Sequence, residues 1–188
     1  FYYLTKAIEI VKQNPNSALV TGPICKKSWA LAGHYFSGQT EVLAKLCGIK
    51  NVGMLFTAKS PITGWRFNTL LATTHIALCE VPKTLNTKLI HSKLDLFKDF
   101  CIKYNKKPTL KVAGLNPHAG EEGILGNEEK NWLENALVTW NDKNRDIKLL
   151  GPLSPDSCWN SSANAWRNKK AEKHDGILAM YHDQGLIP

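Results

Sequence analysis

Short apolar runs that alternate with helix-type segments are the feature that most limits what this chain can fold into. Several runs are continuously apolar, which is typical of strands buried on both faces of a sheet. Between them lie segments whose apolar residues recur every three or four positions, as in amphipathic helices. This alternation predicts a three-layer α/β/α fold. The predicted strands cover residues 17–23, 52–56, 67–75, 109–114, 146–152 and 175–182.

Helix boundaries are predicted from capping and breaking residues. The first helix should end near Asn14–Pro15. A second, short helix is expected over residues 26–32 and should end at Gly33. Thr40 is the predicted N-cap of a helix that ends at Gly48. Two further helices are expected over residues 87–104 and 127–140, and the polar stretch 160–176 is expected to be an exposed insertion or a mobile loop.

Composition restricts the classes of partner. The 188 residues carry a formal net charge of +8, which suits nucleic acid, an anionic membrane or a phosphorylated small molecule. The lysines are scattered rather than interleaved with aromatic residues, which argues against a nucleic-acid partner. No apolar run approaches the roughly 18–20 residues that span a bilayer, so no membrane association is expected. A phosphorylated small molecule is the partner class that fits best.

Cysteine usage indicates the compartment. The five cysteines are odd in number and form no CxxC pair, so a reducing, cytoplasmic location is expected. The chain does not begin with Met and stops within an apparent loop, so it is expected to be an internal fragment.

Three histidines follow predicted strands. His75 comes after "LLATT", His118 after "LKVAGLNP" and His182 after "ILAMY". Ligands of open α/β sheets bind outside the carboxyl ends of the strands, so these side chains could converge. Three histidines with an open position form a recognised catalytic site for a divalent metal. A single loop histidine is more often an ordinary hydrogen-bonded residue, and His34, His91 and His174 are interpreted in that way.

Longer motifs carry a resemblance. The stretches "VAGLNPHAGEEGILGNEE" and "DGILAMYHDQGLIP" resemble the two most diagnostic segments of the 4-hydroxythreonine-4-phosphate dehydrogenase family, NAD-dependent enzymes of vitamin B6 biosynthesis. "TGPICKKSWALAGHYFSGQTEVLAKLCG", "LATTHIALCEVP" and "GPLSPDS" are similar to other family blocks, in the same order. The resemblance covers nearly the whole chain. It implies an isocitrate/isopropylmalate dehydrogenase-like fold, with residues 1–188 as the central part of a two-domain enzyme that lacks its N- and C-terminal segments here.

The resemblance also implies a metal site. In the family three histidines bind one divalent cation, and they match His75, His118 and His182. The family site lies at the interface of a homodimer, with ligands from both subunits, and the metal here is expected to be zinc, cobalt or magnesium. Asp183 could orient a ligand, although a turn-capping role explains it equally well.

The phosphate side of the family site is a His-Thr pair, and this chain has Gln39 and Thr40 at the matching positions. Gln39 can donate a hydrogen bond but cannot carry charge. The family's remaining substrate contacts, a Lys, an Asn and an Arg, are expected beyond Pro188.

The implied reaction is the NAD-dependent oxidation and decarboxylation of 4-phosphooxy-L-threonine to 3-amino-2-oxopropyl phosphate. Asp156 and Asp183 are the candidate catalytic residues. No GxGxxG motif follows a strand, so a Rossmann-type NAD site is not expected. Two alternatives stay open: a related enzyme for another phosphorylated hydroxy acid of the threonate or erythronate type, or an inactive, dimerising metal-binding core.

Overall fold

The computed structural model describes residues 1–36 and 38–188, which form two compact units. Unit 1 is Phe1–Val52 and unit 2 is Gly53–Pro188. No helix among the described residues combines the length and apolar character that crossing a membrane requires. The α/β architecture lies in unit 2.

Unit 2 is built on a five-stranded mixed sheet in the order β1-β2-β5-β3-β4. β1 and β2 form an antiparallel hairpin, whereas β2, β5, β3 and β4 run parallel to one another. The parallel strands therefore bring their carboxyl ends to one edge of the sheet. The strands are β1 (Leu55–Lys59), β2 (Arg66–Leu71), β3 (Thr109–Ala113), β4 (Lys148–Leu153) and β5 (Gly176–Ala179).

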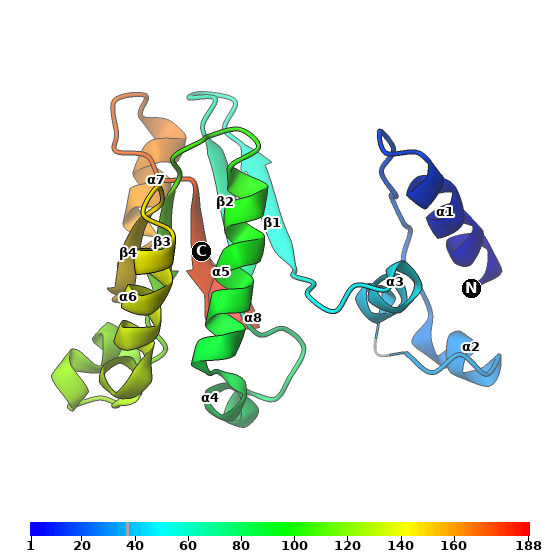
Figure 1. Ribbon diagram of the computed structural model, residues 1–188, viewed down its shortest axis with the longest axis horizontal. Coiled ribbons are helices and arrows are strands. Elements are labelled where there is room, and N and C mark those ends of the chain that lie inside the picture. The colour runs from blue at the N-terminus through cyan, green and yellow to red at the C-terminus, as the bar shows by residue number, and fades with distance from the viewer. Residues whose placement is uncertain (37) are drawn as a thin grey trace. The chain divides into compact units, whose positions relative to one another are not determined.

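Helices cover both faces of this sheet, as Figure 1 shows. Leu94 and Phe97 of α5 pack into one buried cluster with Leu110 and Leu178 of the strands, and α6 adds to the same side. On the opposite face Lys111 of β3 donates a hydrogen bond to Ser161 of α7. The three-layer α/β/α prediction is therefore confirmed for this unit. Its helical segments are η1 (Leu78–Glu80), α4 (Val81–Thr84), α5 (Thr87–Cys101), η2 (Pro117–Gly123), η3 (Glu129–Leu133), α6 (Glu134–Lys143), α7 (Asn160–Arg167) and α8 (His182–Leu186).

The prediction of an exposed insertion over residues 160–176 is wrong in its first half. Residues 160–167 form α7, which buries Ser162 and Ala165. The Ser162 hydroxyl lies 2.9 Å from Nε2 of His174, and both side chains are buried. Small residues on one side of a short helix allow this close packing, which hydropathy alone does not reveal.

Unit 1 contains three helices and no strand among its described residues: α1 (Tyr2–Gln13), α2 (Lys26–Leu31) and α3 (Gln39–Cys47). The strand predicted over residues 17–23 is wrong, because no described strand pairs with it. The N-cap of α3 is Gly38, so Thr40 lies inside the helix rather than capping it. Gly48 ends α3 in the left-handed conformation, as predicted.

Candidate functional site

His75, His118 and His182 follow β2, β3 and β5, three neighbouring strands of the sheet. His182 is the first residue of α8, and His118 lies in η2. Since these strands are parallel, the sheet delivers all three residues to the edge formed by its strand carboxyl ends.

His75 and His182 form a pair. Their ring centroids are 5.3 Å apart. Both residues line a cleft of about 330 Å³ together with Asp183 and Tyr181. Oδ1 of Asp183 lies 2.8 Å from Nδ1 of His182, a distance at which a carboxylate can fix the imidazole tautomer.

His118 has a different neighbour. Its Nδ1 lies 3.6 Å from Oδ1 of Asp156, and both side chains are more than half exposed. The Ser154 hydroxyl donates a hydrogen bond to the same carboxylate oxygen. This bond, with a backbone hydrogen bond and His118 as further causes, holds the pKa of Asp156 below its ordinary value. Asp156 and Asp183 both line a second cleft, of about 290 Å³.

Of the three sequence-predicted metal ligands, His75 and His182 thus form a pair, whereas His118 lies beside Asp156, a predicted catalytic residue. Among residues 1–36 and 38–188, no group of three or more His, Cys, Asp or Glu side chains is close enough to hold a metal ion. One chain therefore does not assemble the three-histidine set by itself in this structure.

The loop that carries His118 has a rare backbone conformation. The five consecutive residues 118–122 have φ between 44° and 81°, the left-handed region. Only Gly120 among them lacks a Cβ. Each of the other four pays roughly 1–2 kcal/mol of conformational free energy to adopt the left-handed conformation. Such a turn persists only if its surroundings impose it.

Glu129 restrains the residues that lead into this turn. Its side chain is only 2% exposed, and its Oε1 accepts hydrogen bonds from the backbone N–H groups of Leu115 (2.7 Å) and Asn116 (2.8 Å). Oε2 accepts a third from the Asn116 side chain at 2.8 Å. These three hydrogen bonds fix the backbone immediately before the left-handed residues.

Gln184 is a second buried polar residue at the same edge. Its Oε1 accepts a hydrogen bond from the Met180 N–H at 2.7 Å, and its Nε2 donates one to the Gly114 carbonyl at 2.8 Å. Sequence reasoning missed both Glu129 and Gln184. The available signal was their place in the histidine motifs, in "NEE" and "HDQG".

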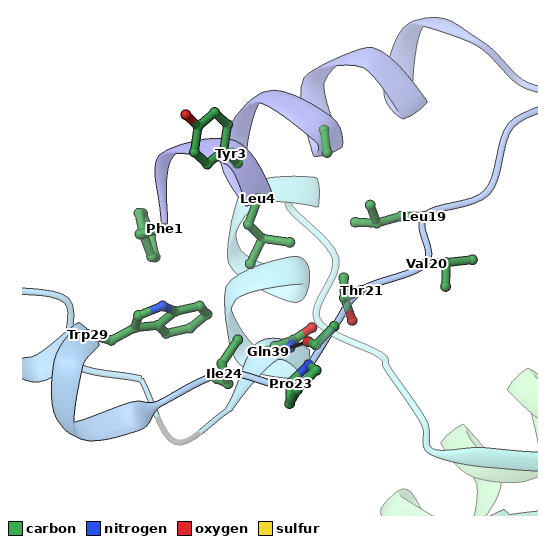
Figure 2. A pocket seen from close by; sticks show the side chains of 12 residues that line it. Phe1, Tyr3, Leu4, Leu19, Val20, Thr21, Pro23, Ile24, Trp29 and Gln39 are labelled. Carbon is green, nitrogen blue, oxygen red and sulfur yellow. Dashed lines mark hydrogen bonds between the residues drawn. The ribbon is translucent and has the colours of Figure 1, made fainter.

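Gln39 and Thr40 lie in unit 1. Gln39 Nε2 donates a hydrogen bond to the Gly22 carbonyl at 2.9 Å. Gln39 also lines a pocket of about 280 Å³ whose other walls include Phe1 and Trp29 (Figure 2). Thr40 is exposed on the first turn of α3 and does not line this pocket.

Comparison with known proteins gives a consistent match. The family model of the pyridoxal phosphate biosynthetic protein PdxA matches residues 1–188. A 4-hydroxythreonine-4-phosphate dehydrogenase from Synechococcus sp. (strain RCC307) is 50% identical over 190 residues, which cover 100% of this chain and 58% of the relative. One from Synechococcus sp. (strain JA-3-3Ab) is 49% identical, covering 100% and 54%.

Comparison with solved structures points to the same family. The crystal structure of 4-hydroxythreonine-4-phosphate dehydrogenase from Klebsiella pneumoniae superposes with a TM-score of 0.82 at 30% sequence identity, over 98% of this chain and 52% of that chain. The chain therefore spans little more than half the length of the curated relatives that it matches.

Proposed function

The chain belongs to the PdxA family of pyridoxal phosphate biosynthetic proteins, and we propose that it is part of an NAD-dependent, divalent-metal-dependent 4-hydroxythreonine-4-phosphate dehydrogenase. The observation that carries the proposal is the match of all 188 residues to this family, combined with three histidines at one edge of the sheet. The relatives described above carry this enzyme name.

The paired imidazoles fit a metal. Histidine nitrogens are among the usual ligands of zinc, and two neighbouring imidazoles could hold such an ion between them. The centroids of His75 and His182 are 5.3 Å apart. Nitrogen ligands of this kind favour zinc or cobalt over magnesium. We assign His75, His118 and His182 as the ligands.

A homodimer would complete the site. A single chain brings only His75 and His182 close together. We therefore propose that His118 of one copy binds a metal ion whose other two histidine ligands belong to a second copy. An interface that joins such a site would be an isologous one, with each copy giving and receiving the same residues.

The carboxylates take supporting parts. Asp183 is placed to hold the His182 imidazole in the tautomer whose Nε2 is available to a metal. Asp156 lies beside His118 and is exposed to the cleft, so it can both steady that imidazole and receive a proton from substrate. Asp156 and Asp183 are therefore the proposed catalytic carboxylates.

The proposed reaction removes a proton from the secondary hydroxyl of 4-phosphooxy-L-threonine and a hydride from the carbon that bears it. The resulting β-keto acid loses carbon dioxide and gains a proton to give 3-amino-2-oxopropyl phosphate. When bound, the cation and NAD supply an electrophile for the substrate oxygen and an acceptor for the hydride. Gln39 and Thr40 are the proposed phosphate contacts, through the amide and the hydroxyl.

We also propose a cytoplasmic location. The cysteines of the described residues are all free, and two of them, Cys101 and Cys158, are buried. Free, unpaired cysteines are typical of proteins from reducing compartments.

The test uses the full-length protein, purified, stripped of metal and then supplied with Zn²⁺, Co²⁺ or Mg²⁺. NADH formation with 4-phosphooxy-L-threonine is expected only after a cation is restored. Phosphorylated threonate and erythronate serve as competing substrates. Higher kcat/KM for either of them, or full turnover in the metal-free protein, would refute the proposal.

A further inference from the structure

Three buried polar side chains are hydrogen-bonded to the segments that carry the histidines. Thr73 is 5% exposed, Glu129 2% and Gln184 8%. Burial of a polar group is unfavourable unless it is hydrogen-bonded, so each of these side chains must have its partners fixed by the fold. Their partners all belong to the histidine-bearing segments.

The hydrogen bonds run from one loop to the next. Thr73, two residues before His75, donates from its hydroxyl to the Met180 carbonyl at 2.7 Å. Met180, two residues before His182, donates its N–H to Gln184. The series therefore joins the end of β2 to the end of β5.

Gln184 continues the series toward His118. Its amide donates to the Gly114 carbonyl at 2.8 Å, at the end of β3. The Gly114 N–H donates to the Leu153 carbonyl at 2.7 Å, at the end of β4, three residues before Asp156. Glu129 then holds the next two backbone N–H groups, those of Leu115 and Asn116.

Glycines make room for this arrangement. A Cβ on Gly114 would come within 3.1 Å of Glu129 Oε1, and one on Gly120 within 3.0 Å of Oε2. Both glycines therefore allow the carboxylate to lie directly beneath the left-handed turn that presents His118. An apolar residue could fill this space, but it could not hold the loop backbone in one position.

We propose that Thr73, Gln184 and Glu129 are positioning residues that form one buried hydrogen-bond series and fix the three histidine-bearing loops relative to one another. The inference rests on the proposed function and deepens it, since the loops carry the proposed metal ligands. It predicts that metal affinity depends on side chains that contact neither metal nor substrate.

The test compares Gln184→Met and Glu129→Gln with Ser162→Ala in the full-length protein. Met keeps the length of Gln184 without its hydrogen bonds, and Gln keeps the shape of Glu129 but replaces one acceptor oxygen with an NH₂ donor. Ser162 (7% exposed) is about as buried as Gln184 (8%), but its hydroxyl lies within hydrogen-bond distance of His174 and contacts none of the three segments that carry the proposed ligands. Co²⁺ alone is the probe for affinity.

Gln184→Met and Glu129→Gln are expected to weaken Co²⁺ binding about 10–100-fold, the usual effect of residues that hold ligands in place. Ser162→Ala should leave Co²⁺ affinity at the wild-type level. In the metal-free protein, amides of residues 114–116, 118 and 180–183 should exchange faster in the two variants, while those of α5 stay protected.

Equal Co²⁺ affinity and equal loop exchange in all variants would overturn the inference, as would a loss in Ser162→Ala matching that in Gln184→Met. If Gln184→Met does not fold, Thr73→Val preserves shape and removes one hydrogen bond, and a loss of affinity of about 2–10-fold is expected. Failure of wild-type protein to bind Co²⁺ would refute the proposed function, whereas the loop exchange of the metal-free variants would still decide this inference.

Discussion

In unit 2 the apolar run "TLKVA" becomes β3 with hydrogen-bonded strands on both sides, whereas the apolar run "ALV" of unit 1 pairs with no described strand. Val112 of the first is 0% exposed, and Val20 of the second is 93% exposed. Both segments have strand-type composition. The difference shows that composition supplies the tendency to extend, while a strand exists only where neighbours accept its hydrogen bonds.

The same contrast holds for the helices. α5 buries Ile90, Leu94, Phe97 and Cys101 against the sheet. Among the described residues of unit 1, Ile8 and Val42 are the buried hydrophobic side chains. Hydrophobic burial is the main favourable contribution to folding, so unit 2 should carry most of the stability of the described chain.

Core substitutions should give the largest difference between the units. Phe97→Ala in α5 should lower the free energy of unfolding of unit 2 by about 3–5 kcal/mol, because the ring is 1% exposed and packs inside the main core cluster. Val42→Ala in α3 should cost about 2 kcal/mol or less, since it removes two buried methyl groups. Hydrogen exchange measured by mass spectrometry on the full-length protein separates the two effects.

Phe97→Ala should accelerate exchange throughout β2, β3 and β5, and Val42→Ala should affect only α1 and α3. Faster exchange of the sheet amides in Val42→Ala, equal to that in Phe97→Ala, would contradict this prediction.

Much of unit 2 could be predicted from the sequence because its signals are local. The runs that became β2 to β5 are apolar and bounded by turn residues, and the helix predicted over 87–104 has Asn86 as its N-cap, with Oδ1 accepting the Leu89 N–H. The position of each histidine after a strand follows from the same runs. These features depend on residues within a few positions of one another.

The missed features depend on distant partners. Glu129 is hydrogen-bonded 13 and 14 positions away, and Gln184 reaches Gly114 across 70 positions. Their place in the motifs "NEE" and "HDQG" marks both residues as candidates for the site, but no local pattern shows that their side chains are buried. The left-handed turn at 118–122 was also beyond prediction, since four of its five residues are non-glycine and avoid that conformation unless a tertiary contact imposes it.

A buried histidine should make unit 2 sensitive to acid. Burial, with Lys111 as a second cause, lowers the pKa of His174 from 6.5 to about 4. Between these values the unfolded chain binds the proton that the folded one excludes, so stability rises with pH through this window and is lost as pH falls. The loss should reach about 3 kcal/mol near pH 4.

His174→Gln should remove this dependence. The difference in unfolding free energy between wild type and variant, measured from pH 7 to pH 4, should change steadily in favour of the variant. A constant difference across that range would show that His174 is not buried in its neutral form. Amides of α7 and β5 should report the change, and those of α1 should not.

Histidines of the two units should differ in metal affinity. His118→Ala removes a proposed ligand and should weaken Co²⁺ binding at least 10–100-fold in the full-length protein, since the loss of supporting residues alone has effects of that size. His34 of unit 1 stacks on Phe1 with ring centroids 3.8 Å apart. His34→Ala should therefore leave Co²⁺ affinity unchanged, and a loss of affinity in this control, or wild-type affinity in His118→Ala, would contradict the assignment of ligands.

The smallest expected effect tests whether unit 1 takes part in binding at all. The family resemblance places a histidine where this chain has Gln39, and Gln39 already donates its amide to the Gly22 carbonyl at the wall of a pocket. Gln39→His would add a group that can be protonated. Because charge-assisted hydrogen bonds to phosphate are stronger than neutral ones, KM for 4-phosphooxy-L-threonine should be about 2–5-fold lower in the variant when measured below pH 7, with kcat nearly unchanged.

Gln13→His, an exposed substitution at the end of α1, is the matched control and should change neither constant. A KM that is identical in wild type and Gln39→His at every pH would mean that this part of unit 1 does not contact the phosphate.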